Sequence, residues 1–124
     1  MTYSIEPSET ESQLRFKSYS PGRIIINDHP YDKPLLLSQE SILHTQAPQF
    51  SQLTPGIISE WVEHYPCELI LIGSGTAACL IDESLFLESN KRGIGHAIMS
   101  TDDCIRTLVA LQSEPRSILC LLTP

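Results

Sequence analysis

The chain has 124 residues, a length that fits one domain with a sizeable core. Its 41% hydrophobic and 19% charged residues are ordinary for a globular protein. The formal net charge of −7 opposes binding to phosphate backbones and anionic lipid surfaces, so nucleic acid is not an expected partner. The longest apolar runs, residues 69–72 and 118–122, are too short to span a bilayer, so membrane insertion is not expected either.

Residues 1–13 are polar and acidic, with Glu6, Glu9 and Glu11, and we expect them to form a disordered tail. They lack the basic and apolar regions of a secretory signal and the arginines of a mitochondrial presequence. The expected location is therefore a bacterial cytoplasm, and residues 14–124 are expected to form a single domain.

The first third of this domain predicts a small antiparallel meander. Alternating residues 14–18 and the β-branched run 23–27 flank a turn at Pro21-Gly22. Residues 35–37 form a third candidate strand, and residues 41–46 form a weaker fourth.

Strands and helices then alternate. Thr54 and Pro55 predict the start of a helix that Pro66 ends, and residues 68–72 predict a buried strand. The inward face of this helix carries Ile57, Ile58, Trp61 and Val62. A second helix over 82–91, a strand over 96–99, a third helix capped by Thr101 and a strand over 117–122 complete the chain, and they indicate parallel neighbours in a central sheet.

A glycine turn, Gly73 to Thr76, follows the buried strand. If strands 68–72 and 96–99 are parallel, this turn and Ser100-Thr101 face one crevice, where open α/β sheets bind ligands. The candidate binding residues are Gly73, Ser74, Gly75, Thr76, Met99, Ser100, Thr101 and Arg106.

The turn also fits a dinucleotide fingerprint, G-x-G-x-x-A, but no helix signal starts before Asp82, so a tight structural turn is the favoured interpretation. Ser74 lacks the flanking pattern of a nucleophile elbow. Arg106 could hold an anion in the crevice, although an ion pair with Asp102, four residues earlier, is favoured.

The four cysteines form no C-x-x-C pair, and Cys79, Cys104 and Cys120 lie in apolar stretches, where we expect buried small hydrophobic side chains. His64 and Cys67 have the spacing of metal ligands, but no second pair accompanies them. We therefore expect no catalytic residue, no metal and no cofactor.

Several segments together carry a resemblance to a known family: YSPGRIIIN (19–27) with Tyr31, LILIGSGT (69–76), GIG (93–95) leading to MST (99–101), and RT (106–107) leading to EPR (114–116). From about Phe16 onward the chain resembles domain-of-unknown-function family 498, a small α/β domain of archaea and bacteria with eukaryotic relatives that include a mitochondrial complex I assembly factor. The resemblance implies a three-layer β/α sandwich around a mixed five-stranded sheet.

The same resemblance implies an accessory or assembly role in the mitochondrial branch and no settled activity in the bacterial branch. This chain departs from the family pattern at Ala97, where an acidic residue is usual, and at Leu108 and Val109, where an aromatic residue and asparagine are usual. If those polar residues form a functional pocket, part of it is lost here.

These features are consistent with two functions. The first is a non-enzymatic accessory domain that binds an unidentified protein partner. The alternative is a binding protein or an enzyme that takes a small molecule or an anion in the crevice at Gly73–Thr76 and Ser100-Thr101. Formation of a homo-oligomer is left open.

Overall fold

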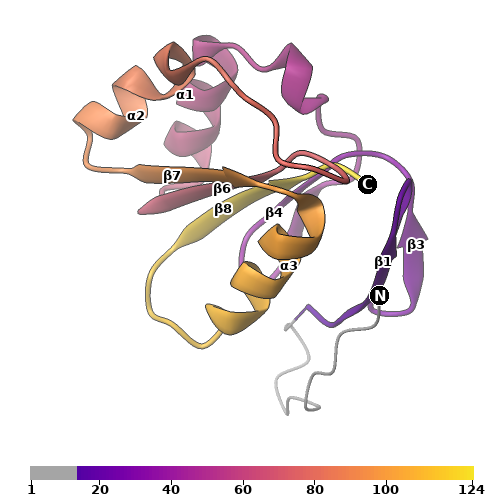
Figure 1. Ribbon diagram of the computed structural model, residues 1–124. Helices are drawn as coiled ribbons and strands as arrows, with labels where there is room; N and C mark the ends of the chain where they lie inside the picture. The colour runs from indigo at the N-terminus through magenta and orange to yellow at the C-terminus, as the bar shows by residue number, and fades with distance from the viewer. Residues whose placement is uncertain (1–13) are drawn as a thin grey trace.

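The computed structural model describes residues 14–124, so the predicted tail lies outside the described residues. A small antiparallel sheet contains β1 (Phe16–Ser20), β2 (Arg23–Ile26) and β3 (His29–Tyr31). A larger sheet contains β4 (Leu35–Leu37), β5 (Ile42–His44), β6 (Leu69–Gly73), β7 (Gly95–Met99) and β8 (Ile118–Leu122). The helices are η1 (Phe50–Gln52), α1 (Pro55–His64), η2 (Glu83–Phe86), α2 (Leu87–Lys91) and α3 (Thr101–Ala110) (Figure 1).

The larger sheet has the strand order β5-β4-β8-β6-β7. Strands β6, β7 and β8 are parallel, with Leu71 opposite both Ala97 and Cys120, whereas β4 and β5 are antiparallel. This confirms the predicted mixed five-stranded sheet and the parallel pairing of residues 68–72 with residues 96–99.

The predicted meander is correct in part. Its third strand is β3, a short edge strand that contains Pro30 and gives little sequence signal. Asn27 and Asp28, with φ of 52° and 66°, make the two-residue hairpin that leads into it. Strands β4 and β5 lie in the large sheet instead, because the fully buried leucines of β4 are covered on both faces.

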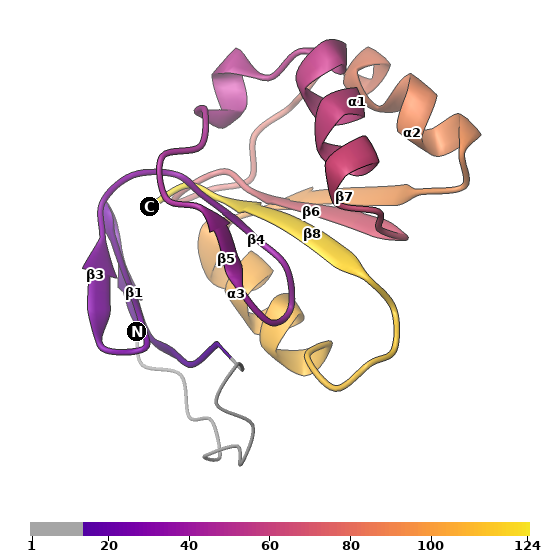
Figure 2. The same ribbon diagram turned by 180° about the vertical axis from the view of Figure 1, so that it is seen from behind.

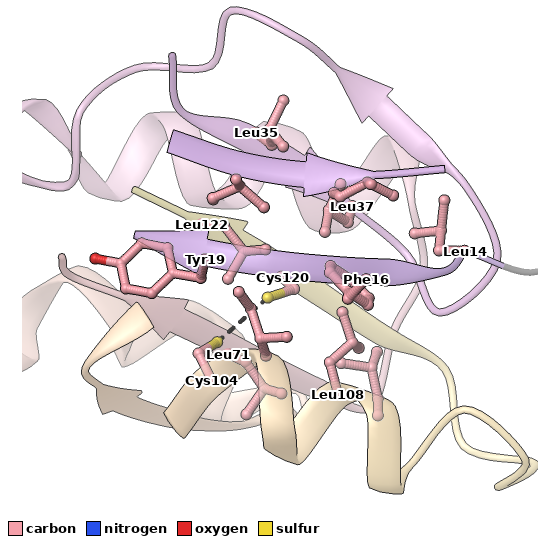
Figure 3. Packing of buried hydrophobic residues seen from close by; sticks show 14 residues of the cluster. Leu14, Phe16, Tyr19, Leu35, Leu37, Leu71, Cys104, Leu108, Cys120 and Leu122 are labelled. Carbon is pink, nitrogen blue, oxygen red and sulfur yellow. Dashed lines mark hydrogen bonds between the residues drawn. The ribbon is translucent and has the colours of Figure 1, made fainter. Parts of the chain in front are cut away.

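Side chains on the two faces of the large sheet build two hydrophobic clusters. Leu71, Cys120 and Leu122 face α3 and the small sheet, which supplies Phe16 and Tyr19 to the same cluster (Figure 3). The opposite face packs against α1, η2 and α2 (Figures 1 and 2). The side chains that it buries from the sheet include Leu36, Ile70, Ile72, Leu119 and Leu121. The result is the predicted three-layer arrangement.

Helix α1 begins as predicted, because the Thr54 hydroxyl accepts from the backbone N–H of Ile57 and Pro55 follows it. The helix predicted over residues 82–91 is divided: Asp82 caps η2, and α2 begins only after Phe86. The cap predicted for α3 is off by one residue, since Ser100, not Thr101, accepts from the backbone N–H of Asp103.

Candidate functional site

Gly73 ends β6 at the point where α3 approaches the sheet most closely. A Cβ atom on Gly73 would lie 3.0 Å from the Cα of Thr101 and 3.1 Å from the Cβ of Cys104. Contacts that short are tighter than nine in ten of those made by real Cβ atoms, so a larger residue would force Thr101 and Cys104 to shift by a few tenths of an ångström. The close approach of α3 therefore favours glycine at this position without any ligand.

Replacing Gly73 by alanine is expected to lower the free energy of unfolding by about 1–3 kcal/mol, the usual cost of overpacking a well-filled interior. Urea denaturation measures the change. Gly56→Ala in α1 is the matched control, because its Cβ would meet only Thr54 Oγ1 at 3.8 Å. That variant should be as stable as the wild type or more so, since alanine is the better helix former. Equal losses in both variants would contradict the close-approach argument.

The glycine turn and the start of α3 do lie together, as the predicted crevice requires. The backbone N–H of Ser74 donates to the Met99 carbonyl (2.9 Å), and the N–H of Thr101 donates to the Gly75 carbonyl (2.8 Å). These bonds occupy two of the backbone donors that a phosphate bound at this turn would use. The two segments therefore close on each other.

The Ser74 hydroxyl is also committed to the turn itself. It donates to the Ala77 carbonyl (2.8 Å) and accepts from the N–H of Cys79 (3.0 Å). With only 6% of its surface exposed, Ser74 fixes the path of the following loop. These contacts support the interpretation of Ser74 as a structural residue and not a nucleophile.

Thr101 is fully buried at the centre of this arrangement. Its hydroxyl accepts from the N–H of Gly75 (2.8 Å) and donates to the Thr123 carbonyl (2.5 Å). One side chain therefore connects the turn after β6, the first residue of α3 and the segment after β8. The predicted capping role is wrong because this hydroxyl points at the sheet, and Ser100 caps the helix instead.

The remaining candidate residues lie around the closed turn. Arg106 is half-exposed and forms an ion pair with Asp102, with 3.1 Å between Nη2 and Oδ2, which confirms the favoured interpretation. Thr76 is exposed beyond the turn, and Met99 is half-buried, with its sulfur 3.5 Å from the Thr107 hydroxyl. Leu108, at one of the positions that depart from the family pattern, is fully buried in the core.

A cavity of about 370 Å³ lies beside the closed turn, between the loop that follows it and β7. We call it the β7 slot. Leu80, on its rim, is fully exposed. Sequence reasoning missed this cavity because the run of residues 77–81 is apolar and gives no sign that it lies outside the core. The slot is lined by Ala78, Cys79, Leu80, Ile81, Glu83, His96, Ala97 and Ile98.

His96 closes one end of the β7 slot. Its ring stacks on Phe86, with 3.9 Å between centroids and 6° between planes. Nε2 lies 2.9 Å from Glu83 Oε2, and Nδ1 lies 3.2 Å from Asn90 Oδ1. Both ring nitrogens are therefore engaged by side chains of η2 and α2, which hold the ring against Phe86.

The cysteines divide into two groups. Cys104 and Cys120 are fully buried, with 3.4 Å between their sulfur atoms, and burial raises the pKa of the Cys120 thiol well above its ordinary value (Figure 3). Cys67 and Cys79 are half-buried, so the prediction of burial is wrong for Cys79, because the loop that carries it lies outside the core. Within residues 14–124, no three His, Cys, Asp or Glu side chains are grouped as metal ligands.

Two further cavities lie away from the glycine turn. One of about 360 Å³ adjoins the start of β8, where Arg116 lies 3.9 Å from Glu114. The other, of about 390 Å³, lies between β5 and α1, where the Tyr65 hydroxyl is 3.2 Å from His44 Nε2. Neither cavity is lined by the candidate binding residues of the glycine-turn crevice.

The fold defines a class of small three-layer α/β proteins with a mixed five-stranded sheet and a small antiparallel sheet. Solved structures of other proteins have the same fold. A Bordetella parapertussis protein matches with a TM-score of 0.79 and 19% identity over 94% of this chain and 99% of its own. A Bordetella pertussis protein, described as an Mth938-like domain, matches with a TM-score of 0.76 and 16% identity over 98% of this chain and 92% of its own.

The chain belongs to the family described as protein of unknown function DUF498/DUF598, whose model matches residues 16–123. This confirms the family that the sequence resembles. A curated relative from Francisella tularensis subsp. holarctica, named "13 kDa major membrane protein", is 26% identical over 121 residues, which are 96% of this chain and 98% of the relative. Of the helices in residues 14–124, none combines the length and the apolar character that crossing a bilayer demands.

Proposed function

We propose that this chain is a non-enzymatic accessory domain that binds another protein through the β7 slot and the exposed Leu80. The observation that carries the proposal is the full exposure of a leucine on the rim of a cavity in an otherwise well-buried structure. The exposed apolar surface continues from Leu80 to Ala78 and Ala77, and contiguous exposed apolar patches are typical of interaction sites. The alternative, a small ligand at Gly73–Thr76, is disfavoured because the N–H groups of Ser74 and Gly75 are already bonded within the chain.

An assembly role fits this surface, because an assembly factor needs a docking site and no reacting groups. The family resemblance implies such a role in the mitochondrial branch. The proposed location is the bacterial cytoplasm. The Francisella relative is named a membrane protein, and a membrane-bound partner would hold this chain at a membrane without a spanning helix.

Site-specific photocrosslinking in native cells tests the proposal. A benzophenone amino acid at position 80 should give one discrete heterologous adduct, identified by mass spectrometry. The same group at position 40, which is exposed in the connection between β4 and β5, should not give that adduct. The substitution Leu80→Asp, with the crosslinker moved to position 78, should remove the adduct. An adduct that forms equally from positions 40 and 80 would overturn the proposed surface.

A further inference from the structure

The outer edge of β7 carries backbone groups that pair with no other strand of residues 14–124. The N–H of Gly95 donates to the Glu68 carbonyl (3.0 Å), and the Met99 carbonyl accepts from the N–H of Ser74 (2.9 Å). These two contacts show which residues of β7 direct their backbone N–H and C=O groups toward β6. Gly95, Ala97 and Met99 direct their N–H and C=O groups at β6, so His96 and Ile98 direct theirs outward. Within residues 14–124, no other backbone group pairs with the outward groups of His96 and Ile98.

This edge lacks the devices that normally prevent pairing with another chain. Strand β7 contains no proline, lysine or arginine, and its five residues pair with β6 in unbroken register. The opposite edge of the sheet differs, because β5 has only three residues and a register irregularity against β4. The two edges are therefore not equivalent, and β7 is the one open to an added strand.

The wall of the slot supplies apolar contacts to such a strand. Ala78, Leu80 and Ile81 lie along the same cavity as His96 and Ile98. Leu80 is fully exposed, so it would gain contacts on binding. A strand added at a sheet edge obtains affinity from main-chain hydrogen bonds and specificity from pockets for alternate side chains.

The charge at the slot is negative. Asp82 and Glu83 are exposed beside it, and Glu83 lines the cavity. The cations nearby in sequence, Lys91 and Arg92, lie 3.7 Å from Glu88 and 3.9 Å from Glu63, respectively. With a chain charge of −7, the slot favours a basic partner. A second copy of this chain would carry the same net charge of −7 and is therefore the less favoured occupant.

We propose that β7 takes up an extended basic segment of a partner protein as an added strand, hydrogen-bonded to the backbone of His96 and Ile98. Small apolar side chains of that segment contact Leu80 and Ile81, and its basic side chains face Asp82 and Glu83. This inference rests on the proposed function, and it specifies the conformation and the charge of the segment that is bound.

Peptide titration followed by amide NMR tests the inference. The probe is a blocked six-residue peptide of alternating valine and lysine. It should shift the amide signals of His96 and Ile98 and leave those of β5 unchanged. Methylating the peptide backbone nitrogens that face β7 should weaken binding at least about tenfold, because hydrogen bonds are lost. Exchanging lysine for glutamate should weaken binding by about the same factor at low salt, and added salt should reduce that difference.

Leu80→Asp is the protein-side variant, because a fully exposed residue can change without unfolding the chain. It should weaken the apolar contact while the thermal midpoint stays the same. Equal affinity of the methylated and unmethylated peptides, or shifts confined to another surface, would each overturn strand addition. Self-association through β7 in place of peptide binding would overturn the basic partner segment as the occupant. If crosslinking from position 80 succeeds while the peptides fail in this way, the proposed function stands and strand addition alone is wrong.

Discussion

Replacing Thr101 by valine is expected to lower the free energy of unfolding by about 2–4 kcal/mol, although the two side chains have nearly the same shape. Valine removes the hydroxyl that accepts from Gly75 N–H and donates to the Thr123 carbonyl. Each buried backbone group left without a partner costs about 1–3 kcal/mol. Chemical denaturation measures the change.

The matched control is Thr101→Ser, which keeps the hydroxyl and removes one methyl group. It should cost about 1 kcal/mol, the value of a single buried methyl. The order of the two variants is the decisive result. If Thr101→Val were as stable as Thr101→Ser, the hydroxyl would not be joining the three segments.

Replacing Phe86 by alanine is expected to lower the free energy of unfolding by about 3–5 kcal/mol, the usual cost of removing a fully buried aromatic ring. Phe86 has no exposed surface and stacks on His96. The loss of its ring removes the support of His96 and opens one wall of the β7 slot. Thermal and urea denaturation measure stability, and the His96 ring signals in NMR report the released contact.

Leu87→Ala is the control for this variant, since the adjacent leucine is 55% exposed. It should change the free energy of unfolding by no more than about 0.5 kcal/mol, as is usual for surface substitutions. A loss comparable to that of Phe86→Ala would mean that α2 itself, and not the aromatic stack, is the sensitive element.

The strongly patterned parts of this fold are predictable from sequence. Unbroken apolar runs at residues 69–72 and 118–122 indicate strands buried on both faces, and both are central in the sheet. Thr54 followed by Pro55 defines a helix start that depends on neighbouring residues only. These signals are local, so a single sequence contains them.

The parts that failed depend on contacts between distant residues. Thr101 and Ser100 are both good caps by sequence, and only the approach of Gly73 to α3 decides between them. The three leucines of β4 look the same whether they extend a meander or pair with a strand more than 80 residues later. The crevice residues do lie together, but the hydrogen bonds that they form with one another join residues about 25 positions apart and cannot be predicted from a local pattern.

The position of β8 has a consequence for synthesis of the chain. This strand is near the end of the sequence, yet it lies between β4 and β6 and pairs with both. On the ribosome, β4 and β6 are made first and remain without their shared neighbour until residues 118–122 emerge. The large sheet therefore closes only after nearly all of the domain has been translated, and until then the edges of β4 and β6 that face β8 lack their partner and are open to aggregation.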